Sequence, residues 1–169
     1  YPLGPAPGIA TLHVDDVELD PEAATLAERF AERVHVADLD LVRVSSIEHD
    51  RFDVIVLGDV LEHLRDPDTT LRDLATLLAP GGRMVISIPN VAHADMRLLL
   101  QEGRWTYHDT GLLDRTHLRF FTRESLREFL AVNGLTATRV ERVVINPFTS
   151  GLPVTAAVHG ADVIDWIDA

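Results

Sequence analysis

Residues 51–90 read RFDVIVLGDVLEHLRDPDTTLRDLATLLAPGGRMVISIPN and decide the class of the fold. The near-continuous apolar run at 52–57 is typical of a parallel strand that is buried on both faces. Leucines at helical spacing then predict a helix over about 67–78. A Pro-Gly-Gly sequence at 80–82 ends this helix and turns the chain into a second strand at 83–88. The order of strand, helix and strand indicates an α/β domain.

The rest of the chain extends this alternation. The pattern predicts strands at 12–19, 34–36 and 138–145, and helices at 21–31, 92–100 and 123–133. Strands that alternate with helices are joined by right-handed crossovers, which places them in a parallel sheet. We therefore expect an α/β fold with a Rossmann-like, doubly wound, mostly parallel sheet and helices on both faces. Residues 1–146 are expected to form this domain, and residues 147–169 a C-terminal tail.

The composition excludes several classes of function. The 169 residues carry a net charge of −12, which repels the phosphates of nucleic acids and of anionic lipids. No apolar run approaches the roughly 18 residues that a membrane span needs, so we expect a cytoplasmic protein without membrane or nucleic-acid partners. Cys is absent, which excludes disulfides and thiolate metal sites. Small molecules remain as partners, and the sequence leaves monomer and homodimer open.

An acidic residue follows each of three predicted strands. These residues are Glu18, Asp38 and Asp59. Because open parallel sheets bind ligands at the carboxyl ends of their strands, we expect these side chains at a ligand site. A carboxylate there can accept hydrogen bonds from a ribose diol or from the amine of an adenine. Capping of helix N-termini is the alternative explanation for acids at such positions.

The order of four segments, VELDPEA, VADLD, FDVIVLGDVLEHLRDP and LLAPGGRMVISIPN, resembles class I S-adenosylmethionine-dependent methyltransferases. The segment DTGLLDRTHLRFFTRESL is similar to small-molecule methyltransferases of polysaccharide, glycan and secondary-metabolite gene clusters. The resemblance covers about residues 17–144. It implies transfer of a methyl group from S-adenosylmethionine to an O or N atom of a small molecule, such as a sugar or a natural-product intermediate. The product of the cofactor is S-adenosylhomocysteine.

The same resemblance implies which residues hold the cofactor. It places Glu18 on the ribose, with Leu19 beside it in the same motif. It places Asp38 by the adenine, where Leu39 supplies backbone and apolar contact. These four residues are the expected cofactor contacts of the first two strand ends.

The methionine part of the cofactor is expected at Gly58 and Asp59. The family has a Gly-rich loop after its first strand, and the matching candidates here are Gly4 and Gly8. No strand precedes them, and Pro5 lacks an amide donor, so the centre of the sheet is expected to be open. We favour an incomplete chain as the explanation. The alternative is a degenerate methyltransferase-like domain that lacks the cofactor and serves as an interaction module.

Methylation of a hydroxyl needs a base near the oxygen, and His is the natural base at neutral pH. His63 and His117 are the expected catalytic residues, ahead of His93 and His108. The histidines and carboxylates do not form a compact metal-ligand pattern along the sequence, so no metal is expected. Two aromatic residues, Trp105 and Tyr107, either stack on the acceptor or pack within the protein.

Overall fold

The computed structural model describes residues 13–47 and 50–142, and over these ranges the chain is an α/β protein. Its strands are β1 (Asp15–Glu18), β2 (Arg33–Val36), β3 (Phe52–Gly58) and β4 (Leu78–Ser87). Its α-helices are α1 (Pro21–Ala27), α2 (Pro67–Thr76), α3 (Ala94–Gln101) and α4 (Arg123–Val132), and short 3-10 helices occur at η1 (Val44–Ser46) and η2 (Leu61–His63). None of these helices is long and apolar enough to cross a membrane.

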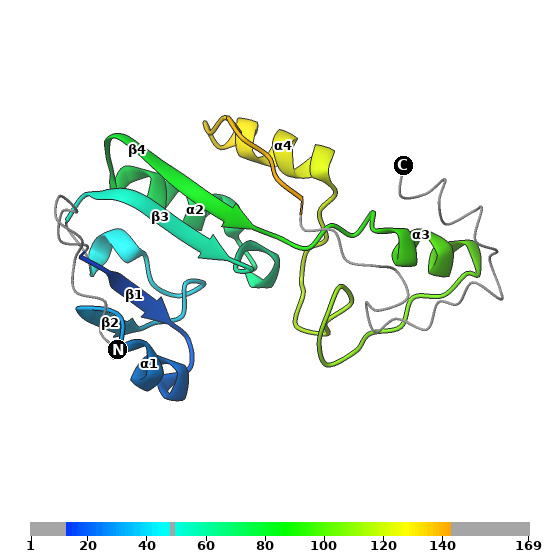
Figure 1. Cartoon of the computed structure of the whole chain (residues 1–169), viewed down its shortest axis with the longest axis horizontal. Coiled ribbons are helices and arrows are strands. Elements are labelled where there is room, and N and C mark those ends of the chain that lie inside the picture. The colour runs from blue at the N-terminus through cyan, green and yellow to red at the C-terminus, as the bar shows by residue number, and fades with distance from the viewer. Residues whose placement is uncertain (1–12, 48–49, 143–169) are drawn as a thin grey trace, which may run out of the picture.

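The four strands pair in parallel, as the alternation of strands and helices predicts. β1 pairs with β2, and Glu18 lies opposite Val36. β3 pairs with β4, and Gly58 lies opposite Ser87. In Figure 1 the arrowheads of β1, β3 and β4 point to the same side, so the carboxyl ends of these strands face one region. Over the described ranges the two pairs are separate two-stranded sheets.

The helix predicted at 21–31 and the strand predicted at 138–145 differ from the structure. α1 ends at Ala27 instead of near residue 31, and residues 28–30 continue as a turn. Ala24 is the buried residue of α1, so little packing is present to support a longer helix. The strand predicted at 138–145 is not formed over 138–142. Its last residues, and the tail predicted at 147–169, lie outside the described ranges.

The helices begin at residues whose side chains satisfy free backbone amides. The Asp20 carboxylate accepts a hydrogen bond from the Glu22 amide at 2.9 Å, at the start of α1. At the start of α4, the side chains of Thr122 and Ser125 each accept a hydrogen bond from the other residue's amide. Because the first turn of a helix leaves its amides without partners, such caps fix where each helix starts.

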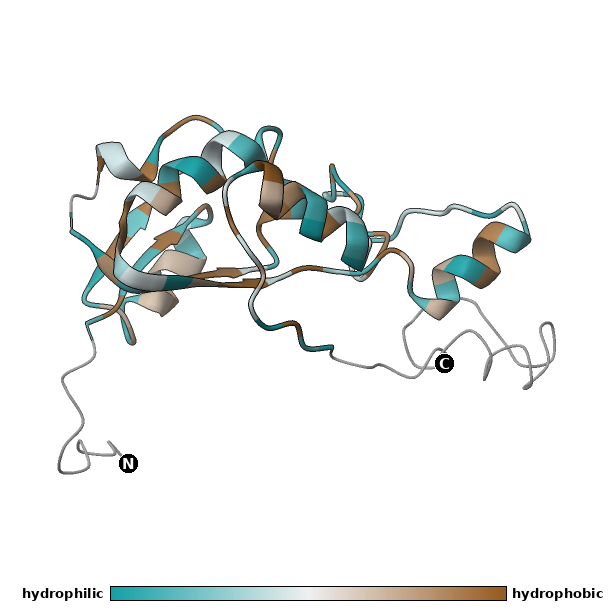
Figure 2. Cartoon of the chain, turned by 90° about the horizontal axis from the view of Figure 1, so that it is seen from above, coloured by the Kyte–Doolittle hydropathy of each residue, from teal (hydrophilic) through white to brown (hydrophobic). Residues whose placement is uncertain are grey.

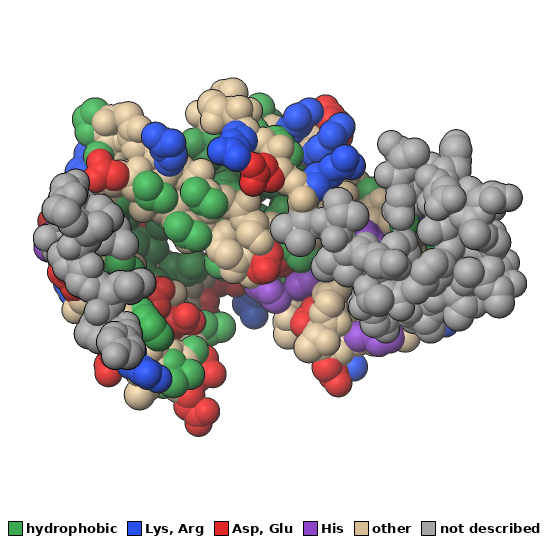
Figure 3. All heavy atoms as spheres, viewed as in Figure 1, with side chains coloured by type: hydrophobic (Ala, Val, Ile, Leu, Met, Phe, Trp, Pro, Cys, Tyr) green, Lys and Arg blue, Asp and Glu red, His purple; other side chains and the backbone are tan. Residues whose placement is uncertain are grey.

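The main hydrophobic core lies between β3, α2 and α4. Leu57, Leu71 and Leu130 are buried in it. Figure 2 shows hydrophobic and hydrophilic residues alternating around the helices, as expected for helices that each bury one face. On the opposite side of the strands, Val54 and Val56 are exposed, and Figure 3 shows hydrophobic side chains over β3 and β4.

Residues 91–121, here called the outer lobe, form a second packing unit. In this lobe α3 buries Met96 and Leu98 together with Leu113. Figures 1 and 2 both place α3 to one side of the strands. The Val91 amide donates to the Phe121 carbonyl at 2.8 Å and closes the lobe at its base. The outer lobe is therefore a separate unit that returns to the strands at a defined place.

The Pro-Gly-Gly sequence lies inside β4 and does not precede it. Leu78 already pairs with Phe52, and the register then shifts so that Val54 pairs with Arg83. The intervening residues bulge out of the ladder, and Gly82 lies at the tightest point of this bulge. A Cβ atom on Gly82 would lie 2.9 Å from the carbonyl oxygens of both Ala79 and Phe52. The predicted turn is thus a β-bulge that only a residue without a side chain allows.

We expect Gly82→Ala to lower the free energy of unfolding by about 2 kcal/mol, because the new methyl group would press on two backbone oxygens that cannot move independently. Chemical denaturation with circular dichroism detection measures this change. Gly58→Ala is the matched control, since no atom lies within 4 Å of a Cβ there. Equal stability of Gly82→Ala and the unmodified protein would show that the bulge relaxes freely.

Candidate active site

Three side chains that can bind a proton or a metal ion meet where the outer lobe contacts η2. Glu62 and His63 belong to η2, directly after the carboxyl end of β3, and His117 belongs to the outer lobe. One ligand atom from each lies within 4.8 Å of the others. The two imidazole rings are 4.7 Å apart between centroids and meet edge to face. Figure 3 shows histidine side chains gathered between the strands and the outer lobe. We call these three residues the Glu-His-His cluster.

Glu62 is the most buried charged group of the cluster. Its side chain is 1% exposed, and neither carboxylate oxygen accepts a hydrogen bond from another described residue. Burial raises the pKa of the Glu62 carboxyl; the backbone amide of Glu62 itself opposes this shift, and the nearby charge of Asp59 adds to it. A buried carboxylate without donors is costly, so a proton or a cation is needed to stabilise it.

The backbone of Glu62 also holds the outer lobe in place. Its carbonyl oxygen accepts hydrogen bonds from the Leu118 amide at 2.8 Å and from the Arg119 amide at 3.1 Å. The Arg119 guanidinium in addition donates to the carbonyl oxygen of Arg65. These bonds join the residues that follow His117 to η2, and so they fix the distance between the two histidines.

Hydrogen bonds orient both imidazole rings. The His63 Nδ1 atom lies 3.1 Å from the Thr116 hydroxyl oxygen, and this hydroxyl donates to Asp114 at 2.6 Å. The His117 Nδ1 atom lies 3.3 Å from the carbonyl oxygen of Leu112. Since a carbonyl oxygen only accepts and the Thr116 hydroxyl gives its proton to Asp114, Nδ1 carries the hydrogen in each ring. The Nε2 lone pairs remain available for a proton or a metal ion.

Asp114 accepts the hydrogen bond of the Thr116 hydroxyl and so stabilises the contact between Thr116 and His63. Hydrogen bonds from the side chain and the backbone amide of Thr116 lower the pKa of the Asp114 carboxyl. Asp114 therefore stays ionised and keeps the Thr116 hydroxyl pointing away from His63.

The end of β3 places Asp59 toward β4. Asp59 has a φ angle of 52°, a left-handed conformation that a residue with a side chain seldom adopts. Its carboxylate accepts a hydrogen bond from the Ser87 hydroxyl at 2.7 Å, and its amide donates to the Ser87 carbonyl. Next to it, Gly58 leaves open space where a Cβ would be. The strained backbone and the open space both lie at a strand end where ligands bind.

Glu18 is the last residue of β1, and Asp38 follows the end of the neighbouring strand β2. The Ala37 amide donates to the Glu18 carbonyl at 2.9 Å, which aligns the two strand ends. One oxygen of the Asp38 carboxylate accepts a hydrogen bond from the Asp40 amide at 2.9 Å and closes a local turn. This bond occupies one oxygen of Asp38.

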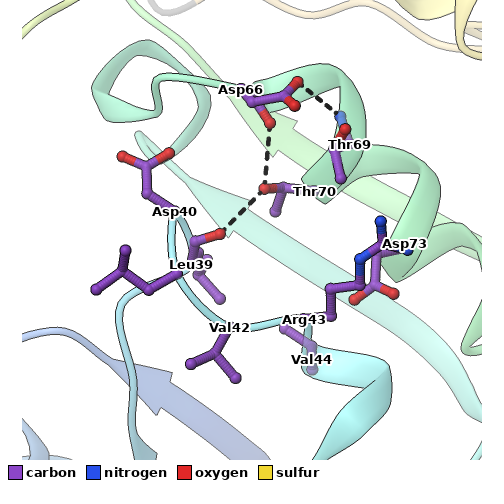
Figure 4. A pocket seen from close by; sticks show the side chains of 10 residues that line it. Leu39, Asp40, Val42, Arg43, Val44, Asp66, Thr69, Thr70 and Asp73 are labelled. Atoms are coloured by element: carbon purple, nitrogen blue, oxygen red, sulfur yellow. Dashed lines mark hydrogen bonds between the residues drawn. The ribbon is translucent and has the colours of Figure 1, made fainter.

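The two expected leucine contacts differ in exposure. Leu19 is 68% exposed, whereas Leu39 is half-buried and packs against the main core. Leu39 also lines a cavity of about 150 Å³ between the loop after β2 and the first half of α2. Figure 4 shows the Thr70 hydroxyl there, 3.4 Å from the carbonyl oxygens of both Leu39 and Asp66. This cavity is too small for a whole cofactor, because sites for such ligands occupy at least about 300 Å³.

An aromatic wall adjoins the Glu-His-His cluster. It consists of Trp105, Tyr107 and Phe120 in the outer lobe. The Trp105 and Phe120 ring centroids are 5.1 Å apart, and Phe120 is 6.2 Å from His117. Trp105 and Tyr107 are 39% and 46% exposed, so both rings can still contact a ligand.

Other residues considered in the sequence have local partners elsewhere. His93 caps α3, and His108 pairs through its backbone with Asp114. Neither belongs to the cluster. Gly4 and Gly8 lie outside the described residues, so their predicted role stays a prediction.

The sequence analysis did not foresee that Glu62 would meet both histidines. The adjacency of Glu62 and His63 was visible, but His117 is 54 positions after His63 in the sequence. The spacing of these residues along the sequence did not predict a compact group of possible ligands. The group forms because the outer lobe folds back onto η2. Ser87 and Thr116 were also missed, because a single hydroxyl residue has no distinctive sequence pattern.

Comparison with known proteins identifies the family. The family described as "Methyltransferase domain" matches residues 3–140, so the chain belongs to this family. A ubiquinone biosynthesis O-methyltransferase of Bradyrhizobium sp. is 30% identical over 138 residues, which cover 78% of this chain and 54% of that protein. The human mitochondrial protein of the same name is 25% identical over 152 residues, covering 88% of this chain and 41% of the relative. The chain thus spans about half the length of these relatives.

A solved structure supports the fold independently. One chain from the complex between the Haloferax volcanii Trm112 methyltransferase activator and a methyltransferase matches with a TM-score of 0.56 and 18% identity. The match covers 89% of this chain and 61% of that one. The similarity confirms the α/β fold of the methyltransferase class that the sequence predicts.

We expect Glu62→Gln to raise the melting temperature at pH 8, measured in EDTA so that no cation masks the carboxylate. The folded-state pKa of Glu62 is raised, so its contribution to stability is present below the ordinary value of 4.5 and is lost as the pH rises through the folded value. The gain from the neutral amide should therefore disappear at pH 4. Glu28→Gln, at an exposed position, should change neither value. A lower melting temperature of Glu62→Gln at pH 8 would contradict this account.

Proposed function

We propose that this protein transfers a methyl group from S-adenosylmethionine to a hydroxyl oxygen of a small molecule. The observation that carries the proposal is the position of Glu18 and Asp59 at the carboxyl ends of parallel strands, in a chain that belongs to the methyltransferase domain family. In open α/β sheets, this edge is where nucleotide ligands bind. An enzyme is favoured over an interaction module because the chain belongs to the methyltransferase domain family and its relatives are named as methyltransferases.

The cofactor would lie across the ends of β1, β2 and β3. Glu18 would accept hydrogen bonds from the ribose diol, with the Leu19 side chain at its edge. Asp38 and Leu39 would contact the adenine, and the half-buried position of Leu39 supports this role.

The methionine end of the cofactor would pass over Gly58 and Asp59. The open space at Gly58 supports a close approach of the ligand to the backbone. Asp59 would bind the amino group of the methionine part, with its carboxylate held by Ser87. Gly4 and Gly8 would contribute the Gly-rich loop.

The acceptor would carry a ring with a hydroxyl group. The names of the relatives specify O-methylation, which favours oxygen over nitrogen as the acceptor atom. The aromatic wall beside His117 supports a ring-shaped acceptor, because Trp105 and Phe120 can contact its apolar face. A natural-product intermediate and a sugar both fit this description.

The reaction requires an in-line displacement at the methyl carbon. The acceptor oxygen forms a bond to this carbon while the carbon–sulfur bond breaks, and its electron pair stays on the sulfur of S-adenosylhomocysteine. The acceptor hydroxyl must lose its proton, and the Glu-His-His cluster is where the protein supplies groups for this step. His63 and His117 are the two histidines with free Nε2 atoms there. The remaining rate enhancement would come from alignment of oxygen and methyl group.

We expect calorimetric titration with S-adenosylhomocysteine to show micromolar binding, and Glu18→Ala to weaken it by about 10- to 100-fold, because hydrogen bonds to a charged group contribute about 1.5–3 kcal/mol. The circular dichroism melting curve should stay unchanged, since Glu18 lies at a strand end. Glu28→Ala is the control with the same loss of charge at an exposed position. Absence of binding by the unmodified protein would favour an interaction module.

We expect Trp105→Ala to raise the KM for a ring acceptor about 10-fold with a small change in kcat, since the loss of one aromatic contact removes about 1 kcal/mol or more of binding. Initial rates with the identified acceptor at saturating cofactor provide the measurement. Phe30→Ala, which removes an exposed ring far from the cluster in sequence, is the control. An unchanged KM would remove the aromatic wall from the acceptor site.

A further inference from the structure

We propose that a groove between α2 and α4 binds the zwitterionic end of an aromatic α-amino acid, whose ring hydroxyl is the group that is methylated. The inference rests on the proposed function and names the substrate class of the same site. It is carried by two side chains of opposite charge, Asp68 and Arg119, which line one groove beside the aromatic wall.

The groove has the size of a small-molecule site. Its volume is about 290 Å³, close to the lower end of the range of about 300–1,000 Å³ that such sites occupy. A molecule with one ring and a short side chain suits this volume. The lining consists of Asp68 of α2, Ser125 and Phe129 of α4, and residues 118–121 of the segment that joins the outer lobe to α4.

Hydrogen bonds of buried groups hold the groove in shape. Asn133 is 7% exposed and joins the two helices. Its amide nitrogen donates to the Asp68 carboxylate at 2.8 Å, and its side-chain oxygen accepts a hydrogen bond from Arg72 at 2.7 Å. The Arg119 amide donates to the Glu62 carbonyl oxygen at 3.1 Å. The groove is therefore formed before a ligand binds, as most small-molecule sites are.

Both charged side chains of the groove have further hydrogen-bonding capacity. The bond from Asn133 uses one carboxylate oxygen of Asp68, and a carboxylate has two. The Arg119 guanidinium donates to the carbonyl oxygen of Arg65, and a guanidinium has five N–H groups. The Ser125 hydroxyl, in contrast, is engaged in the cap of α4. One negative and one positive group can thus bind a ligand in the groove.

The balance of charge selects a zwitterion. Hydrogen bonds from Thr69 lower the pKa of the Asp66 carboxyl, and the nearby charge of Arg119 contributes in the same direction. A phosphate at Arg119 would therefore meet the negative charges of Asp66 and Asp68, and a simple amine at Asp68 would meet Arg119. An α-amino acid presents both charges side by side. Its carboxylate can pair with Arg119 while its ammonium group pairs with Asp68.

The apolar part of the groove suits an aromatic ring. The ring centroids of Phe121 and Phe129 are 5.4 Å apart. Phe120 lines the groove and also belongs to the aromatic wall, and its ring centroid lies 6.2 Å from that of His117. Phe120 thus connects the groove to the Glu-His-His cluster. A ligand ring that packs on Phe120 would carry its hydroxyl toward His117.

The reacting hydroxyl would be a phenol. A phenol has a pKa of about 10, far below the value of about 15.7 for water, so a neutral imidazole can more easily take its proton. The phenol oxygen forms a bond to the methyl carbon, and the electron pair of the broken carbon–sulfur bond stays on sulfur. The products are S-adenosylhomocysteine, an aryl methyl ether and one proton, which passes to an imidazole of the cluster.

The first test compares ligands that differ only at the charged end. They are L-tyrosine, tyramine, which lacks the carboxylate, and 3-(4-hydroxyphenyl)propionate, which lacks the ammonium group. NMR titration of the unmodified protein, with and without S-adenosylhomocysteine, measures their dissociation constants. We expect L-tyrosine to bind at least about 10-fold more tightly than either analogue, because each analogue leaves one charged group of the groove without a partner. Equal binding of the three ligands, or no binding of L-tyrosine, would overturn the proposal.

Two variants assign each charge of the ligand to its partner. Arg119→Gln should weaken the binding of L-tyrosine by about 10-fold and leave tyramine, which has no carboxylate, unaffected. Asp68→Asn should weaken L-tyrosine to a similar extent and leave 3-(4-hydroxyphenyl)propionate unaffected. Arg123→Gln, at an exposed position of α4 outside the lining of the groove, is the control. An equal loss of L-tyrosine and tyramine binding in Arg119→Gln would contradict the proposed pairing. The comparison of ligands on the unmodified protein remains decisive if Asp68→Asn does not fold.

Calorimetric titration with S-adenosylhomocysteine alone separates this inference from the proposed function. Binding of S-adenosylhomocysteine without a preference for L-tyrosine would overturn the amino-acid site and leave the methyltransferase function in place. A preference for L-tyrosine without S-adenosylhomocysteine binding would support the amino-acid site and count against the proposed function.

Discussion

The backbone carbonyl oxygen of Glu62 accepts hydrogen bonds from two backbone amides of the outer lobe. The candidate active site depends on this contact. The bonds from Leu118 and Arg119 bring His117 next to His63, although the two residues are far apart in the sequence. Glu62 itself is buried at this contact. Burial raises the pKa of its carboxyl. The two hydrogen bonds to the Glu62 carbonyl oxygen therefore hold the aromatic wall and His117 near the strand ends.

The strand ends form the other half of the site and depend on a different constraint. Parallel pairing places Glu18 beside the end of β2 and Asp59 beside Ser87. The left-handed backbone at Asp59 is held by its bonds to Ser87, which shows how a neighbouring strand can maintain a conformation that is unfavourable by itself. The candidate cofactor site therefore depends on the geometry of the strands. The candidate acceptor site depends on the contact of the outer lobe with η2.

Local sequence signals predicted the elements that have local causes. The helices predicted to begin at 21 and 123 do begin there, because the capping side chains of Asp20 and Thr122 need only their own first turn. The apolar run at 52–57 forms a parallel strand as predicted, but the predicted burial on both faces was wrong, because Val54 and Val56 are exposed. The Pro-Gly-Gly sequence was placed wrongly, as a turn before the strand. Leu78 pairs with Phe52 before this sequence is reached, and that pairing is a long-range event.

The sequence by itself determined the α/β class, the methyltransferase family and the acids at the strand ends, because periodicity and short motifs are properties of neighbouring residues. Only the tertiary structure decided that Glu62, His63 and His117 form one cluster. It also decided that Thr116 and Asp114 orient His63 and that the aromatic wall adjoins the cluster. The physical reason is that these contacts join residues across a chain reversal, whose position is set by backbone hydrogen bonds to Glu62 and not by any local pattern.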